Sequence, residues 1–131
     1  MFGWKEEYST GIPIIDEQHK KLFQIADKIH TTLDDELAVD KYDKIVELVE
    51  ELKDYTVFHF KTEEDYMLSI GYRKYFSHKV EHNDFVEKIN SIDYTQLDKD
   101  QDAYLRDILT FVVEWISNHI LKNDKMINKP A

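Results

Sequence analysis

Apolar residues recur at steps of three and four positions along most of the chain. This spacing places apolar side chains on one face of an α-helix and polar side chains on the other. The first such segment covers about residues 16–36 and starts at Asp16, the expected N-cap. Its apolar positions are Ile15, Leu22, Ala26, Ile29 and Leu33. We therefore predict an amphipathic helix in this segment.

Three further segments carry the same pattern, at about residues 40–70, 74–92 and 99–127. The first of them is expected to end at Gly71, because glycine readily adopts the left-handed conformation that terminates a helix. Its regularly spaced positions are Ile45, Val49, Leu52, Thr56, His59, Glu63, Tyr66 and Ile70. Those of the other two are Tyr75, His78, His82, Phe85, Ile89 and Ile92, and then Leu105, Ile108, Val112, Trp115 and His119.

Residues 1–14 contain aromatic and turn residues without helical spacing, which predicts an extended N-terminal arm. The four amphipathic segments that follow are joined by short polar connections. Such a pattern favours an all-α fold, an antiparallel up-down-up-down four-helix bundle. We expect residues 1–131 to form a single domain of this kind.

The composition narrows the class of protein. The chain is 42% hydrophobic and 34% charged, as is typical of a soluble globular domain. Its formal net charge of −10 repels phosphate backbones, so we expect no nucleic-acid partner. The N-terminus lacks the apolar core of a signal peptide, and no apolar run reaches membrane-spanning length. We therefore expect a cytoplasmic protein that does not insert into membranes.

Six ionisable residues occupy stripe positions where apolar side chains are expected: His19, His59, Glu63, His78, His82 and His119. A buried unpaired carboxylate is very costly, and a buried imidazole without a hydrogen bond costs roughly 1–3 kcal/mol. One hydrogen-bonded core histidine would be ordinary, whereas five favour a shared metal site. Since the chain has no cysteine, its metal ligands must be nitrogen and oxygen atoms.

The spacing of these residues favours chelation. Residues four apart project from one helix face about 6 Å along the axis, so His59 pairs with Glu63, and His78 with His82. Asp124 follows His119 by five residues, about 140° around an ideal helix. It can join the site only if the helix unwinds locally or contains a π-bulge, and by itself it would be interpreted as a surface carboxylate.

The number of ligands indicates the kind of site. Five imidazoles and two carboxylates are too many for one structural zinc ion and too rich in nitrogen for calcium or magnesium. Two transition-metal ions fit better, with the carboxylates bridging and the imidazoles divided three and two. The ion with only two imidazoles would then have one vacant coordination position.

Four short motifs contain these residues: IDEQH at 15–19, HFKTE at 59–63, HKVEH at 78–82 and HILKND at 119–124. Together they resemble the ligand signature of the hemerythrin family, specifically of its single-domain bacterial members. The resemblance implies two iron ions per chain, bridged by two carboxylates and an oxo or hydroxo group, with O2 binding at the five-coordinate iron. One iron would take His78, His82 and His119, the other His19 and His59, with Glu63 and Asp124 as the bridges.

An apolar pocket around the vacant position would exclude water and protons. The residues predicted to line it are Ile15, Phe60, Ile116 and Ile120, each of which is at least as compatible with ordinary bundle core. His30 lies about 16 Å along the helix from His19 and is expected to lie outside the site.

Sequence and resemblance together predict reversible O2 binding for intracellular transport, storage or delivery to O2-consuming enzymes, without a catalysed reaction. We expect O2 as the ligand, an O2-consuming enzyme as a partner, and a monomeric chain. One open alternative is an O2 or redox sensor. Another is a di-iron oxidase or peroxidase-like enzyme, which would need a proton donor such as Tyr66 or Tyr8, and a third is iron storage or structural metal binding.

Overall fold

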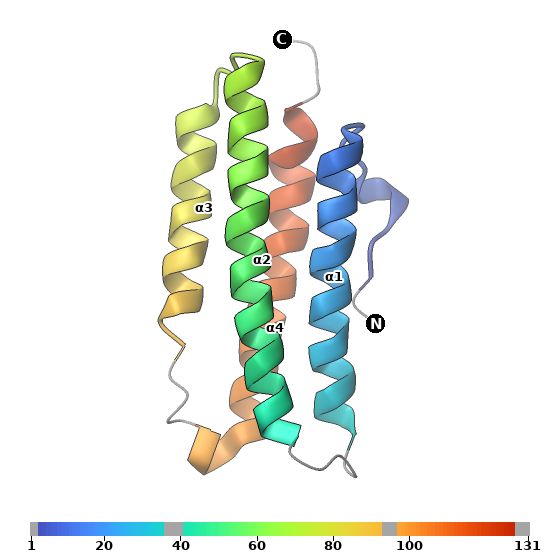
Figure 1. Cartoon of the computed structure of the whole chain (residues 1–131), viewed down its shortest axis with the longest axis vertical. Coiled ribbons are helices and arrows are strands. Elements are labelled where there is room, and N and C mark those ends of the chain that lie inside the picture. The colour runs from blue at the N-terminus through green and yellow to red at the C-terminus, as the bar shows by residue number, and fades with distance from the viewer. Residues whose placement is uncertain (1–2, 36–40, 93–96, 128–131) are drawn as a thin grey trace.

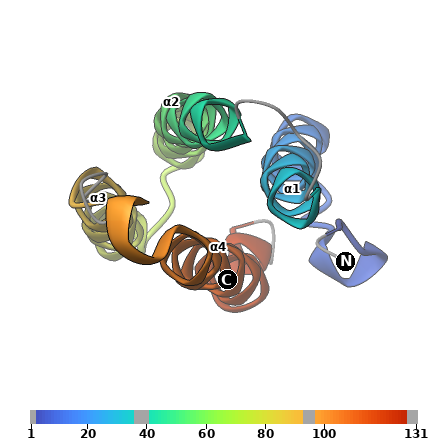
Figure 2. The same ribbon diagram turned by 90° about the horizontal axis from the view of Figure 1, so that it is seen from below.

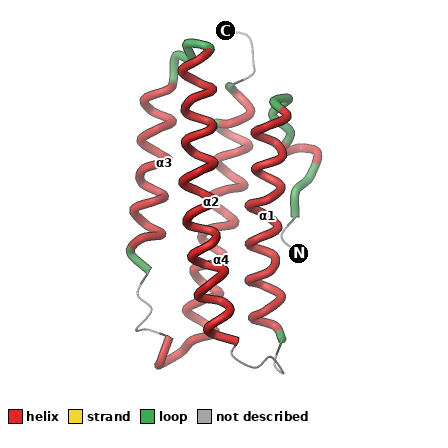
Figure 3. The backbone as a smooth tube through the Cα atoms, viewed as in Figure 1, coloured by secondary structure: helices red, strands yellow, loops and turns green. Residues whose placement is uncertain are grey.

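The computed structural model describes residues 3–35, 41–92 and 97–127. Four helices account for most of them: α1 (Pro13–Asp34), α2 (Lys41–Ser69), α3 (Tyr75–Asn90) and α4 (Leu97–Lys122). Two short 3-10 helices flank the bundle, η1 (Glu6–Tyr8) and η3 (Asp124–Met126). The described residues contain no strand (Figure 3), so the predicted all-α class is confirmed. None of the helices in these ranges is long and apolar enough to cross a membrane.

The helices form an antiparallel bundle in which each runs opposite to the one before it (Figure 1). Viewed along the bundle, they stand in chain order around a common interior, with α1 packed against both α2 and α4 (Figure 2). The predicted up-down-up-down arrangement is therefore confirmed. One end of the bundle, at the top of Figure 1, contains the start of α1, the turn from α2 to α3 and the end of α4.

Most of the apolar stripe positions that the sequence predicted lie in the core, but Ile70, the last position of the second stripe, is 48% exposed because α2 ends at Ser69. Its main cluster includes Leu22, Ile29, Ile45, Leu52, Phe85, Leu105, Val112 and Ile116, each at most 3% exposed. A smaller cluster of Ile12, Ile15, Met67 and Ile127 lies where the start of α1, the end of α2 and the residue after η3 meet. Burying side chains of this size contributes roughly 1.5–3 kcal/mol each, so packing rather than helix propensity stabilises the bundle.

Asp16 was predicted to be the N-cap of the first helix, and this was wrong. The helix begins three residues earlier, at Pro13, with Ile12 as its N-cap. Proline suits this first position because the missing N–H would have no helical partner there. The carboxylate of Asp16 instead accepts hydrogen bonds from the backbone N–H of Thr10 at 2.8 Å, from its hydroxyl at 2.7 Å and from the hydroxyl of Ser9 at 2.9 Å.

These bonds attach the N-terminal arm to the first turn of α1. Burial raises the pKa of Asp16, but the hydrogen bonds from Thr10 and Ser9 outweigh it and hold that pKa below its usual value. The arm is less extended than predicted, since residues 6–8 form η1 and Tyr8 stacks on Phe23 with ring centroids 5.2 Å apart. The predicted bounds at residues 36 and 40 and the first two residues of the arm lie outside the described residues.

Gly71 lies where the chain reverses from α2 into α3. Its φ of +64° is in the left-handed region, as expected for a residue that terminates a helix. The N–H of Tyr72 donates to the carbonyl of Met67 at 2.9 Å and closes the turn. The turn sets α3 against α2 and thereby places His78 beside Glu63.

Candidate metal centre

The seven residues predicted to bind metal meet in the interior of the bundle. They come from all four helices and from η3, toward the end of the bundle where α2 turns into α3 (Figure 1). Each is at most 5% exposed: His19, His59, Glu63, His78, His82, His119 and Asp124. The interior at this level is therefore polar, although the surrounding layers are apolar.

Asp124 reaches the cluster because α4 ends just before it. The helix stops at Lys122, Asn123 adopts φ −117° and ψ −55°, and a 3-10 turn starts at Asp124. The tighter turn rotates the carboxylate inward, where its Oδ1 lies 3.1 Å from Nε2 of His119. The local unwinding that the five-residue spacing required is present, as a 3-10 turn and not as a π-bulge. The fourth helix thus ends earlier than the predicted residue 127.

Two groups of potential ligand atoms can be distinguished among the described residues. The first, called here the three-histidine group, contains Glu63, His78, His82, His119 and Asp124. Oε1 of Glu63 lies 2.7 Å from Nε2 of His78 and 3.1 Å from Nε2 of His82. Oδ1 of Asp124 lies 2.8 Å from Nε2 of His78. The five ligand atoms lie within 4.8 Å of one another, which is compact enough to surround one ion.

The second, called here the two-histidine group, contains His19, His59, Glu63 and Asp124. Oε2 of Glu63 lies 3.1 Å from Nε2 of His59, and Oδ2 of Asp124 lies 3.0 Å from Nε2 of His19. Each carboxylate therefore directs one oxygen to each group. This is the arrangement expected of carboxylates that bridge two ions.

Carboxylates next to the outer ring nitrogens of two histidines favour a tautomer whose inner nitrogen is free to bind metal. Nδ1 of His82 lies 2.9 Å from Oε2 of Glu64, and Nδ1 of His119 lies 3.1 Å from Oε2 of Glu81. A carboxylate only accepts, so in the neutral imidazole the proton resides on Nδ1 and Nε2 keeps its lone pair. The Nε2 atoms of His82 and His119 are nevertheless only 3.1 Å apart. A cation between such lone pairs would remove their mutual repulsion.

The two-histidine group also contains buried polar atoms whose hydrogen bonding is incomplete. Both ring nitrogens of His19 and Oε2 of Glu63 are buried and lack a well-aligned hydrogen bond within the described part of the chain, although Nε2 of His19 lies 3.0 Å from Oδ2 of Asp124 and Oε2 of Glu63 lies 3.1 Å from Nε2 of His59. Such groups are costly unless a metal ion or another partner compensates them. The donor atoms, their burial and their missing partners therefore fit two metal ions with nitrogen and oxygen ligands.

In the metal-free cluster, the carboxylates and imidazoles shift one another's pKa values. Burial raises the pKa of Glu63, but the imidazoles around it, first among them His19 and His59, lower that pKa well below its usual value. Burial and the charge of Glu63 also raise the pKa of Asp124, whereas His119 and His19 lower it by more. Both carboxylates are therefore ionised and available as ligands near neutral pH.

The histidines respond to these two carboxylates in different ways. Burial lowers the pKa of His19 and of His78, but contacts with Asp124 and Glu63 outweigh burial and raise both values to about 9. For His59, burial dominates and the pKa falls below its ordinary value. Without metal, protons thus provide part of the positive charge that the carboxylates require. Metal binding has to displace these protons.

Aromatic rings enclose the three-histidine group. Phe60 stacks on His82 with centroids 3.8 Å apart, and Trp115 stacks on His119 at 4.4 Å. The four residues predicted to line an O2 pocket are all buried: Ile15, Phe60, Ile116 and Ile120. Phe60 lies against the three-histidine group through its stack on His82, and its ring is 5.9 Å from that of His59 in the two-histidine group. His30 forms an ion pair with Asp34 at 3.1 Å on the helix surface and belongs to neither group.

Sequence reasoning assigned no role to Gln18, Glu64 or Glu81, which contact the outer nitrogens of three histidines. Each is a direct neighbour in sequence of a predicted ligand. Neighbours on a helix project about 100° apart, so none of the three falls on the stripes from which the site was identified. A polar residue directly beside His19, Glu63 and His82 was the signal that could have revealed them.

Comparisons with known proteins extend over nearly the whole chain. The family model described as the hemerythrin HHE cation binding domain matches residues 10–129. A bacteriohemerythrin of Clostridium acetobutylicum is 51% identical over 125 residues, which cover 95% of this chain and 97% of that protein. A bacteriohemerythrin of Methylococcus capsulatus is 32% identical over 120 residues, covering 92% of this chain and 88% of that protein.

A solved structure shows the same likeness in three dimensions. The crystal structure of a wild-type hemerythrin superposes with a TM-score of 0.77 at 33% sequence identity. The superposition covers 96% of this chain and 94% of that one. The likeness therefore includes the helices that carry both groups of ligands.

Proposed function

Since the chain belongs to the hemerythrin family, we propose that it holds two iron ions in its buried cluster and binds O2 there reversibly. The observation that carries the proposal is the pair of ligand groups that share both carboxylates. A one-ion site would leave the remaining imidazoles and carboxylate oxygens buried without partners. Two ions satisfy every ligand atom at once.

Each group would hold one ion. The three-histidine ion would take His78, His82 and His119, the two-histidine ion His19 and His59, and Glu63 and Asp124 would bind both. An oxo or hydroxo group completes the proposed bridge. With only two histidines, the second group would leave a coordination position open, and the iron pair would supply the electrons that reversible O2 binding requires.

The residues of the chain control what reaches that position. All seven ligand side chains are at most 5% exposed, and Ile15, Ile116 and Ile120 are buried in the adjacent layers. We propose that these apolar side chains and Phe60 exclude water and protons, which slows irreversible oxidation of the pair. Five neutral imidazoles also favour holding O2 over activating it, in contrast to the carboxylate-rich sites of ferritin-like enzymes.

The physiological role we infer is O2 transport, storage or delivery to O2-consuming enzymes in the cytoplasm, without catalysis by this chain. The relatives named bacteriohemerythrin support that role. We further infer that residues 1–131 form one hemerythrin-like domain, supported by the family match over residues 10–129, and that the chain is monomeric.

The proposal is tested by cycling the gas phase over the reduced, iron-loaded protein while its visible spectrum is recorded. We expect a new absorption band on admitting O2, its disappearance on removing O2, and the same amplitude over repeated cycles. His59→Ala removes one ligand of the O2-binding iron and should abolish the cycle, whereas His30→Ala removes a histidine outside the cluster and should preserve it. A single irreversible oxidation of the unmodified protein would favour an enzyme or a structural metal site instead.

A further inference from the structure

The two groups of histidines differ in the side chains that contact their outer ring nitrogens. In the three-histidine group, the outer nitrogens of His82 and His119 lie against the carboxylates of Glu64 and Glu81, at 2.9 Å and 3.1 Å. In the two-histidine group, the outer nitrogen of His59 donates to the side-chain carbonyl of Gln18 at 2.8 Å. Carboxylates thus lie against two outer nitrogens of the three-histidine group, whereas an amide lies against the outer nitrogen of His59 in the two-histidine group.

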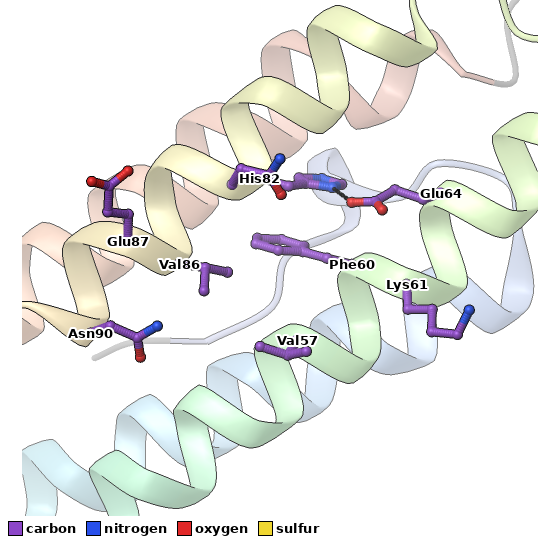
Figure 4. Close-up of a pocket in the computed structure, with 9 residues that line it drawn as sticks. Val57, Phe60, Lys61, Glu64, His82, Val86, Glu87 and Asn90 are labelled. Atoms are coloured by element: carbon purple, nitrogen blue, oxygen red, sulfur yellow. Dashed lines mark hydrogen bonds and ion pairs between the residues drawn. The ribbon is translucent and has the colours of Figure 1, made fainter.

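Glu64 reaches its histidine across the space between two helices. A surface groove of about 540 Å³ runs between α2 and α3, and Phe60, Glu64 and His82 line it (Figure 4). Glu64 extends from α2 over the edge of this groove to the ring on α3, and its side chain is only 16% exposed. The nearby Lys61 forms its ion pair with Asp65 at 3.4 Å. The charge of Glu64 is therefore directed at His82.

Glu81 contacts its histidine together with the turn that carries Asp124. The side-chain amide of Asn123 donates to Oε2 of Glu81 and also lies 3.1 Å from Nδ1 of His119. When Nε2 of His119 binds metal, Nδ1 and the amide are both donors, and only Glu81 can accept from the two. Glu81 thereby fixes the ring of His119 to Asn123, the residue between α4 and η3.

Such contacts affect the ion as well as the ring. A carboxylate that accepts the Nδ1–H bond holds the metal-binding tautomer and increases electron density at Nε2, which makes the imidazole a stronger donor to a cation. The effect is larger inside a protein than in water because the local dielectric constant is lower. Glu64 should contribute more than Glu81, whose side chain is 49% exposed and better screened by solvent.

We propose that Glu64 and Glu81 are positioning residues that make the three-histidine position the tighter of the two and the one better able to retain a more highly charged ion. Gln18 leaves the two-histidine position as the weaker one, which is the position proposed above to bind O2. The inference rests on the proposed two-ion centre. It adds to that centre an electrostatic difference between its halves, arising from three residues that do not bind metal.

The first test uses Co2+ as the probe and involves no O2. Titration of the metal-free protein, followed by visible absorption, should show two binding steps of unequal affinity. Glu64→Gln keeps the size and an accepting oxygen but removes the charge, so it should weaken the tighter step by about 10- to 100-fold and leave the weaker step unchanged. Glu81→Gln should also weaken the tighter step, but by a smaller factor. Glu51→Gln, an exposed residue of the same helix, is the matched control and should change neither step.

The second test measures the reduction potential of the iron-loaded protein. Glu64→Gln should shift it to more positive values, because the higher charge on the ion is less well stabilised. Gln18→Glu adds a charge behind His59 while keeping an accepting oxygen, and it should shift the potential to more negative values. An unchanged potential in either variant, or shifts of the same sign in both, would overturn the proposal.

The two readouts separate this inference from the function on which it rests. If Co2+ binds in two unequal steps that respond to Glu64→Gln but O2 cycling fails, the asymmetry is correct and the O2 function is not. If O2 cycles normally while Glu64→Gln changes neither the Co2+ steps nor the potential, the function is correct and the role of Glu64 is refuted. Because Gln18→Glu removes no hydrogen-bond acceptor, its potential decides the question even if Glu64→Gln impairs folding.

Discussion

The metal-free protein should lose stability as the pH rises from about 6.5 to about 9, whereas the metal-loaded protein should not. The perturbation is pH, and it acts on His19 and His78. Contacts with Asp124 and Glu63 outweigh burial and raise the pKa of both imidazoles from the ordinary 6.5 to about 9. In this range the folded chain holds protons that the unfolded chain has already released.

The direction of this change in stability follows from proton linkage. A group whose pKa is higher in the folded state stabilises the fold fully below the unfolded value of 6.5 and loses that contribution as the pH rises through about 9. The lowered pKa values of His59, Glu63 and Asp124 act below this window and leave it unaffected, whereas the pKa of His82, which burial lowers but Glu63 and Glu64 raise by more, adds a contribution of the same sign.

The magnitude can be worked from the same values. The difference between 6.5 and about 9 corresponds to on the order of 3 kcal/mol for one imidazole. His19 and His78 share the same two carboxylates, so their joint contribution is smaller than twice that amount. Domains are typically stable by about 5–15 kcal/mol, so the loss should be easily measured.

The assay is urea unfolding of the metal-free protein in the presence of a chelator, followed by far-ultraviolet circular dichroism at pH 6.5 and pH 9. We expect the midpoint to fall at pH 9 with an unchanged slope, since the surface exposed on unfolding is the same. Bound Co2+ should reverse the trend, because metal binding displaces the protons and strengthens as they leave. A midpoint that stays constant or rises with pH in the metal-free protein would refute the reasoning.

Three further predictions concern single residues. His119→Ala should bind one Co2+ per chain instead of two, and retention of both ions in that variant would refute its assignment as a ligand. Gly71→Ala should lower the unfolding free energy by about 1–2 kcal/mol because φ is +64° there, while Gly3→Ala, with nothing within 4 Å of the added Cβ and φ outside that region, should change nothing. Asp16→Asn should cost about 1–2 kcal/mol at pH 7 through its bonds to the arm. That cost should shrink below about pH 4, where the carboxyl group of the unmodified protein becomes protonated, and a pH-independent cost would contradict this account.

The parts of the structure that follow from periodicity could be predicted from the sequence. The stripes placed His59 with Glu63 and His78 with His82 because residues four apart share a helix face whatever the tertiary context. Even the inward turn of Asp124 could be predicted, because a residue five positions after His119 can reach the same site only if the helix changes its pitch. The all-α class followed for the same reason.

The parts that depend on contacts between segments could not be predicted. Asp16 has the chemistry of an N-cap, but Pro13 starts the helix earlier and the carboxylate instead attaches the arm at Thr10. Glu64 and Gln18 lie beside the stripes, and their partners belong to other helices, at separations of 18 and 41 residues in sequence. Such pairings arise from the packing of helices, which a stripe does not specify.

The proposed function requires that two iron ions in one chain bind one O2 molecule and release it again. The most direct measurement is a gas-uptake titration of the reduced protein, with iron and protein determined in the same sample. We expect two irons and one O2 per chain, with the O2 recovered when its pressure is lowered. O2 that is consumed and not recovered, or uptake by a chain that holds a single iron, would contradict it.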